Sequence, residues 1–377
     1  MPRYFLKTFG CQQNVADSER IASFYESRGF EAAESEECAD TIVINTCVVR
    51  ERAAEKVFGL IRNLSHLKEK NPNLAFVITG CLIGAASREP SGKMMKSLRA
   101  RLPDVEFLPL EEVGFEYSPK RAMGRLASIP ISNGCNNFCT FCIVPFSRGR
   151  ERSRPFGDIV DEVQAAVACG RDEILLLGQN VNSYGADLLM DALGGRTESF
   201  RLPNGDEVKP TMVKHLNRHR IPTLFPQLLE EVAMVPGVAN VSFVSSNPWD
   251  FSDDLIAVIA RNENIDRLLH LPVQSGSDDV LKRMNRWYSR EEYLALIDRI
   301  RECIPEARFT TDIIVGFPGE TREDFEATLD LAKRARFEKS YTARYSPRPG
   351  TAASKFLDDV PYEEKKRRWK ELDSLVN

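Results

Sequence analysis

The sequence predicts an α/β protein in two parts, an open parallel-sheet domain over residues 1–125 followed by a partial (β/α)6 barrel over residues 126–360. Short apolar strands alternate with stretches of helical periodicity along almost the whole chain. The chain has 377 residues, roughly two and a half times a typical domain. Its 42% apolar and 28% charged residues are typical of folded globular proteins and exclude a globally disordered chain.

The N-terminal part is expected to contain four strands, at Arg3–Phe9, Thr41–Asn45, Leu74–Thr79 and Val105–Leu108, with helices near 15–28, 50–69 and 92–101. Cys11, Cys47 and Cys81 each follow one of the first three strands within two residues. The carboxyl ends of parallel strands meet at one edge of an open sheet, so we expect these thiols to lie close together although 36 and 34 residues separate them. The alternative is that three small apolar side chains merely end three strands, because free cysteine is often buried.

Glycine directly precedes Cys11 and Cys81, which suits a tight turn and a close approach of the backbone to a bulky group. Cys38 precedes its strand, and we therefore expect it at the opposite edge of the sheet.

Six strand-helix units are expected from Leu126 onward. The strands are predicted at 126–132, 173–177, 240–245, 267–271, 308–315 and 337–345, and the helices at 156–169, 224–235, 252–262, 277–303 in two pieces, and 321–336. A parallel barrel places its site at the carboxyl ends of its strands. The polar segment 185–222 interrupts the second unit, and its PNGDE centre predicts a turn between two short strands. Residues 361–377 are expected to form a terminal charged helix.

The nine cysteines point to metal or redox chemistry. Their number is odd and the N-terminus lacks the pattern of a secretory signal, so a disulfide framework is not expected. No apolar run approaches the roughly 18 residues of a membrane span. We therefore expect a soluble, cytoplasmic protein without a membrane partner. The 51 basic and 55 acidic residues give a net charge of −4, from which no nucleic-acid partner follows.

Cys135, Cys139 and Cys142 lie in GCNNFCTFC, directly after the first predicted strand of the barrel. Three thiolates on one short loop can hold three irons of a [4Fe–4S] cluster and leave the fourth iron open to a small ligand. A structural zinc site is the alternative, but zinc needs a fourth Cys or His at comparable spacing. The next candidates, Cys169 and His215, are distant in sequence.

The CxxxCxxC spacing, with Phe141 directly before the third cysteine, resembles the radical S-adenosylmethionine (SAM) superfamily. Longer motifs are similar to the methylthiotransferases of that superfamily, and among these to the branch that modifies adenosine in tRNA. They are GCQQNVADSER (10–20), GCNNFCTFCIVPFSRGRERSRP (134–155), LLGQNVNSYG (176–185), LPVQSGSD (271–278), DIIVGFPGET (312–321) and YSPRPGTAAS (345–354).

The resemblance implies an enzyme that transfers a methylthio group to C2 of N6-isopentenyl-adenosine 37 in the anticodon loop of tRNA. It implies two [4Fe–4S] clusters and two molecules of SAM, one the methyl donor and one the source of a 5′-deoxyadenosyl radical. By that resemblance Cys11, Cys47 and Cys81 ligate an auxiliary cluster, and Cys135, Cys139 and Cys142 ligate the radical SAM cluster. An electron donor such as flavodoxin or ferredoxin and a sulfur source are the further partners implied.

Two other functions remain open from the sequence. One is a methylthiotransferase acting on another tRNA adenosine derivative or on a ribosomal-protein aspartate. The other is a non-catalytic, zinc-stabilised RNA-binding module.

The resemblance also implies contacts to SAM. Phe141 lies on the cluster loop, while Gly178, Gln179 and Asn180 end the second strand, where the amino group is held. Ser275 and Gly276 match the carboxylate region, and Val315 and Gly316 lie near the adenine. Each of these motifs has a simpler interpretation, since a glycine-rich turn alone is weak evidence.

The sequence departs from the family in two places. Ser246, Asn247 and Pro248 stand where a Ser-His-Pro is expected, which puts a role for histidine there in doubt. The family usually continues into a small RNA-binding TRAM domain, whereas this sequence ends at Asn377, and we expect a reduced affinity for tRNA.

Local basic clusters are the candidate phosphate contacts. Four arginines at 148, 150, 152 and 154 follow the cluster loop, and a second basic group lies at 214–220. The third group, at 365–370, is better explained as a solvated helix face. Phe138 and Phe146 are candidates for stacking on a flipped-out base.

Overall fold

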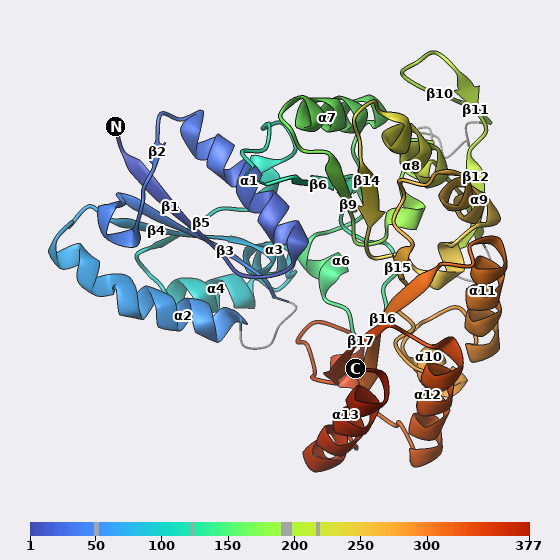
Figure 1. Ribbon diagram of the computed structural model, residues 1–377. Coiled ribbons are helices and arrows are strands. Elements are labelled where there is room, and N and C mark those ends of the chain that lie inside the picture. The colour runs from blue at the N-terminus through green and yellow to red at the C-terminus, as the bar shows by residue number, and fades with distance from the viewer. Residues whose placement is uncertain (49–52, 122–123, 190–197, 216–218) are drawn as a thin grey trace. The chain divides into compact units, whose positions relative to one another are not determined.

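The computed structural model describes residues 1–48, 53–121, 124–189, 198–215 and 219–377 (Figure 1). The chain folds into two compact units. Unit 1 consists of Met1–Gly124, Gly134–Asn136 and Cys142–Arg150, and unit 2 of Arg125–Asn133, Asn137–Phe141 and Glu151–Asn377. The loop with Cys135, Cys139 and Cys142 therefore contributes residues to both units.

Unit 1 is built on a five-stranded sheet whose strands are all parallel and lie in the order β2-β1-β3-β4-β5. The strands are β1 (Arg3–Thr8), β2 (Glu31–Ala32), β3 (Thr41–Thr46), β4 (Ala75–Gly80) and β5 (Val105–Phe107). All six residues of β3 are buried, as expected for a central strand covered on both faces. The strand order reverses between β1 and β3, and open α/β sheets bind ligands beyond the carboxyl ends of the strands at such a point.

Helices cover both faces of this sheet. They are α1 (Gln12–Glu26), α2 (Ala53–Leu64), α3 (Cys81–Arg88), α4 (Lys93–Arg101) and α5 (Leu110–Val113). The short helix α6 (Val144–Ser147) belongs to the same unit and packs on α3. Ile42 and Ile44 of β3 pack in a core with residues of α2, α3 and α4, whereas Val43 packs in a second core with residues of α1. The alternation of side chains along a strand thus divides one apolar strand between two cores.

Unit 2 contains six parallel strands in two three-stranded sheets, β14-β9-β6 and β15-β16-β17. They are β6 (Leu126–Pro130), β9 (Glu173–Leu177), β14 (Asn240–Phe243), β15 (Leu268–His270), β16 (Arg308–Val315) and β17 (Lys339–Arg344). A parallel bridge between Val241 and Ile265 joins the two sheets, so the six strands follow one another in chain order. This arrangement confirms the predicted partial (β/α)6 barrel.

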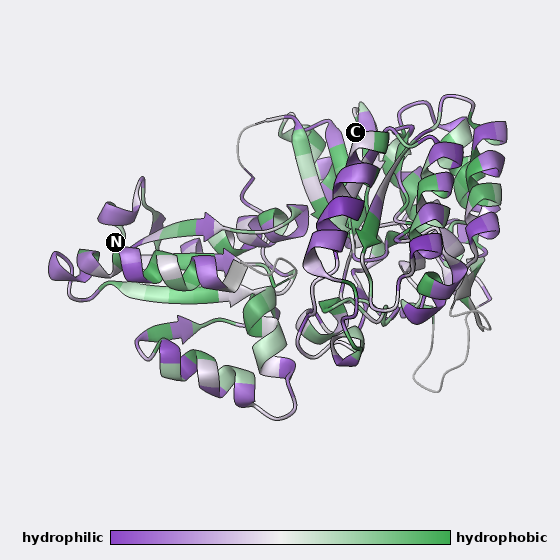
Figure 2. Cartoon of the chain, turned by 90° about the horizontal axis from the view of Figure 1, so that it is seen from below, coloured by the Kyte–Doolittle hydropathy of each residue, from purple (hydrophilic) through white to green (hydrophobic). Residues whose placement is uncertain are grey.

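The helices of unit 2 are amphipathic, and hydrophilic and hydrophobic residues alternate along them in Figure 2. They are α7 (Phe156–Ala168), α8 (Phe225–Met234), α9 (Asp253–Arg261), α10 (Asp278–Arg283), α11 (Arg290–Cys303), α12 (Arg322–Ala335) and α13 (Tyr362–Val376). Ser289 and Thr321 cap α11 and α12 with reciprocal capping boxes. The last helix, α13, covers the edge strand β17, where Trp369 Nε1 donates to the Thr342 carbonyl at 2.8 Å.

Some elements differ from the sequence prediction. Helix α3 was not predicted and begins at Cys81, directly after β4. Two short antiparallel strands, β7 (Ser132–Asn133) and β8 (Arg152–Ser153), flank the loop of the second cysteine group. The turn expected at PNGDE is confirmed as a hairpin of β10 (Phe200–Arg201) and β11 (Glu207–Val208). A further hairpin pairs β12 (Thr211–His215) with β13 (His219–Thr223), and residues 190–197 and 216–218 of the predicted insertion lie outside the described residues.

Among the described residues, no helix combines the length and apolar character needed to span a bilayer.

The close packing of Gly276 against α12 predicts a large effect of one methyl group. A Cβ at Gly276 would lie 2.5 Å from the Ala327 carbonyl oxygen and 2.5 Å from Thr328 Cα, both backbone atoms. We expect Gly276→Ala to lower the free energy of unfolding by about 1–3 kcal/mol, measured by chemical denaturation. Gly157→Ala is the control, because the nearest atom to its Cβ is 3.8 Å away. Equal denaturation midpoints for the two variants would contradict this packing.

Candidate functional site

Cys11, Cys47 and Cys81 lie at the carboxyl edge of the unit 1 sheet, as predicted. Cys11 is the N-cap residue of α1, Cys47 follows β3, and Cys81 is the first residue of α3. Cys47 and Cys81 are buried, and Cys11 is exposed. Burial raises the pKa of Cys81 to about 11, and the nearby Cys47 thiol contributes to this rise. Among the described residues, no three His, Cys, Asp or Glu side chains are arranged to hold a metal ion, so the ligand role stays a prediction.

Two glycines allow the chain to turn into this edge. Gly80 has φ +92°, and a Cβ there would lie 2.3 Å from the Thr46 carbonyl oxygen. Gly10 has φ +146°, and its Cβ would lie 2.4 Å from Asn14 Oδ1. Neither position accepts another residue without displacing the turn, which confirms the tight turns expected before Cys11 and Cys81. The close approach to a bulky group stays a prediction.

Buried amides hold the turn after β1 against β3. Asn14 Nδ2 donates to Asn45 Oδ1 at 3.1 Å, and Asn45 Nδ2 donates to the Asn14 carbonyl at 2.8 Å. Gln13 is also buried, and neither polar atom of its amide has a hydrogen-bond partner in the described structure. Buried polar atoms are rarely left unpaired, so this edge is chemically suited to a further polar group. Soft thiol donors beside it fit an iron–sulfur cluster.

Arg148 lies in the same unit and contacts one of the three thiols. Its Nε donates to Cys81 Sγ at 3.2 Å, and its Nη2 pairs with Asp17 Oδ2 at 2.6 Å. Only 4% of its side chain is exposed. The role in phosphate binding that the sequence suggested for Arg148 is therefore wrong, because its charge is directed into the protein.

The other basic residues expected to contact phosphate include both buried and exposed side chains. Arg154 is buried and pairs with Glu162 at 2.7 Å, whereas Arg150 and Arg152 are exposed. The side chains of the second basic group, at 214–220, lie outside the described residues. In the third group Lys365 and Arg368 are buried, which corrects the expectation of a wholly solvated face.

The loop with the second cysteine group is anchored within each unit by backbone hydrogen bonds. In unit 1, the Cys135 amide donates to the Gly149 carbonyl at 3.1 Å. In unit 2, the Thr140 amide donates to the Met284 carbonyl at 3.0 Å, and the Ala353 amide donates to the Thr140 carbonyl at 2.8 Å. Cys135 is buried, and Cys139 and Cys142 are half-buried. The three cysteines therefore lie on a segment that backbone hydrogen bonds fix in place.

Arg286 is the buried cation beside this second group. Its Nη1 donates to Cys139 Sγ at 3.6 Å and to Asn247 Oδ1 at 2.9 Å, and its Nη2 donates to the Pro272 carbonyl at 2.6 Å. Asn247 occupies the position where the family resemblance led us to expect histidine. The structure thus gives that position a role in holding Arg286. Nothing in the sequence marked Arg286, which follows α10 as one of many arginines.

The residues that end β9 belong to a buried network. Asn180 Nδ2 donates to Asp250 Oδ2 at 2.6 Å and to Ser183 Oγ at 3.0 Å. The Ser183 hydroxyl donates to Glu151 Oε1 at 2.6 Å. Burial raises the pKa of Glu151 to about 8, so this carboxyl group is mostly protonated at neutral pH. Sequence reasoning missed Glu151 and Asp250, because a single acid among arginines resembles an ordinary surface charge.

Two other residues predicted to hold the SAM amino group lie beside this network. Gly178 is buried, and a Cβ there would lie 2.9 Å from Ser132 Oγ. Gln179 is half-buried. The amide of Asn180 is bonded within the protein. The contacts of Gly178, Gln179 and Asn180 to SAM stay predictions.

The residues predicted to contact the SAM carboxylate and adenine lie where β15 and β16 end, and much of their polar capacity is used within the protein. The Gly276 amide donates to Thr328 Oγ1 at 2.9 Å, and the Gly316 amide donates to both carboxylate oxygens of Glu320 at 3.0 Å. Ser275 is buried and Val315 is 1% exposed. Phe141 packs against an apolar cluster that includes Phe317. These side chains therefore shape the site.

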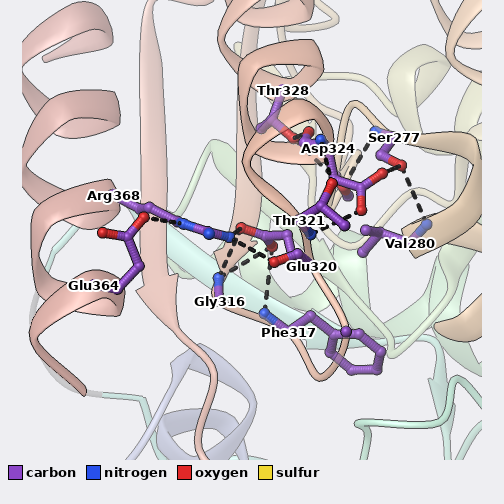
Figure 3. Close-up of polar contacts among 12 residues, drawn as sticks. Ser277, Val280, Gly316, Phe317, Glu320, Thr321, Asp324, Thr328, Glu364 and Arg368 are labelled. Atoms are coloured by element: carbon purple, nitrogen blue, oxygen red, sulfur yellow. Dashed lines mark hydrogen bonds and ion pairs between the residues drawn. The ribbon is translucent and has the colours of Figure 1, made fainter. Parts of the chain in front are cut away.

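Helix α13 holds the loop after β16 in place (Figure 3). Arg368 Nη1 pairs with Glu320 Oε1 at 2.7 Å, and Arg368 Nε donates to Glu364 Oε1 at 2.8 Å. The same Glu320 carboxylate accepts from the Gly316 amide, and a Cβ on Gly316 would lie 2.3 Å from Lys365 Cγ. The terminal helix thus positions the Gly316–Gly319 turn, which the resemblance predicts to lie near the adenine.

The three remaining cysteines have a different placement. Cys38 precedes β3, as expected for the opposite edge of the sheet, and Cys169 and Cys303 lie at the ends of α7 and α11. All three are exposed.

Comparison with known families gives two matches along the chain. Residues 129–332 match the radical SAM superfamily, and residues 3–98 match the uncharacterized protein family UPF0004. Among solved structures, the radical SAM methyltransferase TsrM from Kitasatospora setae aligns with a TM-score of 0.61 and 15% identity, over 94% of this chain and 77% of that one. The radical SAM enzyme OxsB aligns with a TM-score of 0.54 and 13% identity, over 100% and 55%. The superfamily match covers more than half of the chain, which defines a radical SAM enzyme that uses SAM and a [4Fe–4S] cluster.

Sequence relatives narrow the class. A protein of Carboxydothermus hydrogenoformans is 42% identical over 99% of this chain and 83% of its own length. One of Dictyoglomus thermophilum is 41% identical over 100% of this chain and 82% of its own length. Both are named tRNA-2-methylthio-N(6)-dimethylallyladenosine synthase. The chain belongs to this family of tRNA methylthiotransferases.

The buried acid of the barrel predicts a pH-dependent stability. The Glu151 carboxyl has a pKa raised from 4.5 to about 8, so the folded state keeps a proton that the unfolded chain loses. The contribution of Glu151 to the free energy of unfolding should therefore be highest below pH 4.5, fall as pH rises from 4.5 to about 8, and level above that. Each pKa unit is worth about 1.4 kcal/mol, which makes the fall a few kcal/mol.

Glu151→Gln removes this titration and keeps an oxygen to accept from Ser183. The difference in unfolding free energy between Glu151→Gln and the parent, followed by denaturation from pH 5 to 9, should grow in favour of the variant. A difference that does not change with pH would contradict a buried, protonated Glu151.

Two neighbouring arginines of α13 offer a matched test of the Glu320 contact. Both pair with Glu364, but the side chain of Arg368 is 6% exposed and that of Arg367 is 51% exposed. Arg368→Met strands the buried Glu320 carboxylate and should lower the free energy of unfolding by about 3–5 kcal/mol. Arg367→Met should lower it by about 0–1 kcal/mol. If thermal and chemical denaturation show that the two variants lose similar amounts of stability, the distinction between Arg368 and Arg367 is refuted.

Proposed function

We propose that this protein transfers a methylthio group to C2 of N6-isopentenyl-adenosine 37 in the anticodon loop of tRNA, and that it does so with two [4Fe–4S] clusters and two molecules of SAM. The observation that carries the proposal is the first set of thiols, near the N-terminus. Cys11, Cys47 and Cys81 gather at the carboxyl edge of β1, β3 and β4, with Arg148 hydrogen-bonded to Cys81. A radical SAM enzyme with one cluster needs only the Cys135, Cys139 and Cys142 group, so the first set supports an additional centre.

The two cysteine groups fit iron–sulfur clusters for different reasons. The N-terminal thiols sit beside the unpaired Gln13 amide and the buried Arg148 guanidinium. The loop thiols sit on a segment held by backbone hydrogen bonds in both units. When bound, the loop cluster and SAM supply a 5′-deoxyadenosyl radical, which removes a hydrogen that no side-chain base takes from an unactivated carbon at neutral pH.

The chain's own residues then bind and orient the reactants. Gln179 lies directly after β9, where the family resemblance implies a contact to the amino group of SAM. The turn at Gly316 and the side chains of Val315 and Phe141 shape the adenine region, and Arg368 holds that turn through Glu320. Because Glu151 is mostly protonated at neutral pH, the network after β9 carries less negative charge there than its composition suggests.

The RNA contacts are proposed from exposed residues alone. Arg150 and Arg152 are exposed and follow the cluster loop in sequence, so they are placed to bind phosphate. Phe138 and Phe146 are 50% and 40% exposed, as a side chain that stacks on an unpaired base must be. An electron donor such as flavodoxin or ferredoxin and a sulfur source complete the proposed partners.

Alanine substitution of each cysteine group tests whether the two groups have different roles in SAM cleavage and in sulfur insertion. With Cys11, Cys47 and Cys81 all replaced, we expect reductive cleavage of SAM to continue while the 2-methylthio nucleoside disappears from tRNA, because the radical source remains and the sulfur site is lost. With Cys135, Cys139 and Cys142 replaced, both activities should disappear. Chromatography of 5′-deoxyadenosine measures the cleavage of SAM, and mass spectrometry of digested tRNA measures the 2-methylthio nucleoside.

The control is the exposed Cys303→Ala, which should keep both activities. Loss of SAM cleavage in the N-terminal triple variant would mean that the two groups are wrongly assigned. Modification of a ribosomal protein in place of tRNA would overturn the proposed substrate.

A further inference from the structure

The segment that follows the cluster loop carries a permanent positive charge to the N-terminal thiols. Helix α6 begins two residues after Cys142 and packs on α3, the helix that begins at Cys81. Arg88 Nη1 donates to the Ser147 carbonyl at 2.6 Å. A Cβ on Gly84 would lie 2.0 Å from the same Ser147 oxygen, so the two helices touch backbone to backbone. Arg148, the next residue, is thereby fixed in its position against Cys81.

The described partners of Arg148 include one carboxylate and one thiol. Its guanidinium bonds Asp17 at 2.6 Å and Cys81 at 3.2 Å, and the Cys11 thiol also lies within its electrostatic reach. A second cation, Arg88, lies near Arg148 and Cys81, and its charge is paired with Glu111. The side chain of Arg148 is 4% exposed and that of Asp17 is 12% exposed, so salt and water screen this group weakly.

We propose that Arg148 is a positioning residue that raises the reduction potential of the cluster bound by Cys11, Cys47 and Cys81, through its N–H···S bond to Cys81 and its buried positive charge. Hydrogen bonds to the sulfurs and the net charge around a cluster are the main means by which a protein sets that potential. One-electron reduction adds a negative charge, which a fixed neighbouring cation stabilises. This inference rests on the proposed two-cluster function.

Asp17 has the opposite effect in this arrangement. Its carboxylate orients the guanidinium and also cancels part of its charge at the thiols. Removing Arg148 and neutralising Asp17 should therefore shift the potential in opposite directions. An ion pair that only holds the segment after α6 on α1 would produce no such reversal of sign.

The test uses the full chain with Cys135, Cys139 and Cys142 replaced by Ala, so that a cluster can form only at the N-terminal thiols. After anaerobic reconstitution with iron and sulfide, redox titration followed by electron paramagnetic resonance gives the midpoint potential. At the parent's midpoint, Arg148→Gln should lower the ratio of reduced to oxidised cluster at least tenfold, which is about 59 mV for one electron. Asp17→Asn should raise that ratio, and the exposed Arg150→Gln should leave it unchanged.

Each result of this titration either supports or overturns the inference. If the cluster has the same potential in the parent and in Arg148→Gln, the inference about Arg148 is overturned, and the two-cluster function is not affected. If Arg148→Gln yields no folded protein, Asp17→Asn decides, because an unshifted or lowered potential in that variant overturns it. A parent that binds no iron at Cys11, Cys47 and Cys81 overturns the two-cluster function itself, and this inference with it.

Discussion

The parallel direction of the strands is the constraint on which the placement of both cysteine groups depends. In the main sheet of unit 1 and in both barrel sheets of unit 2, every ladder is parallel. Parallel strands need crossover helices and end at a common edge. Residues far apart in sequence, such as Cys11 and Cys81, therefore lie at one edge without any direct link between them. Glycines at 10 and 80, whose conformations exclude a side chain, let the chain turn there.

Buried arginines are the second feature common to the two groups. Arg148 donates to Cys81 and Arg286 donates to Cys139, each from a fully buried position. Burying a cation is unfavourable unless it is paired or well hydrogen-bonded. Arg148 is paired with Asp17, and Arg286 donates to Cys139, Asn247 and the Pro272 carbonyl. Each arginine thus combines two effects: it fixes a loop through several hydrogen bonds, and it places positive charge beside a thiol. The protein controls the electrostatics of its cysteines from within the fold, independently of its overall charge of −4.

Much of the fold could be predicted from the sequence, because apolar strands and amphipathic helices have distinct periods. The strands 173–177 and 308–315 have the predicted bounds, and the edge position of Cys11, Cys47 and Cys81 followed from topology alone. The burial of Arg148 and Arg154 could not be predicted. Four arginines alternating along seven residues look alike in sequence. Only tertiary packing distinguishes the buried ones, on α3 for Arg148 and against Glu162 of α7 for Arg154. Arg286 and Glu151 were missed for a similar reason, since their partners are distant in sequence.

Helix α13 shows how an element can have a different role from the one its composition suggests. Its charged sequence indicates a solvated helix, yet Trp369 and Arg368 bind it to β17 and to the turn after β16. The buried face is narrow, so the average composition conceals it. The loop expected near adenine therefore depends on a helix more than 40 residues further along the chain.

The iron content of the two triple-alanine variants tests the central claim most directly, namely that the chain contains two separate cluster sites. After anaerobic reconstitution, the parent should hold ~8 iron and ~8 sulfide per chain, as two cubanes. Each triple variant should keep ~4 of each, with the cubane spectrum of the remaining site in Mössbauer spectroscopy. One zinc per chain without sulfide, or complete loss of iron on replacing either cysteine group alone, would contradict the account.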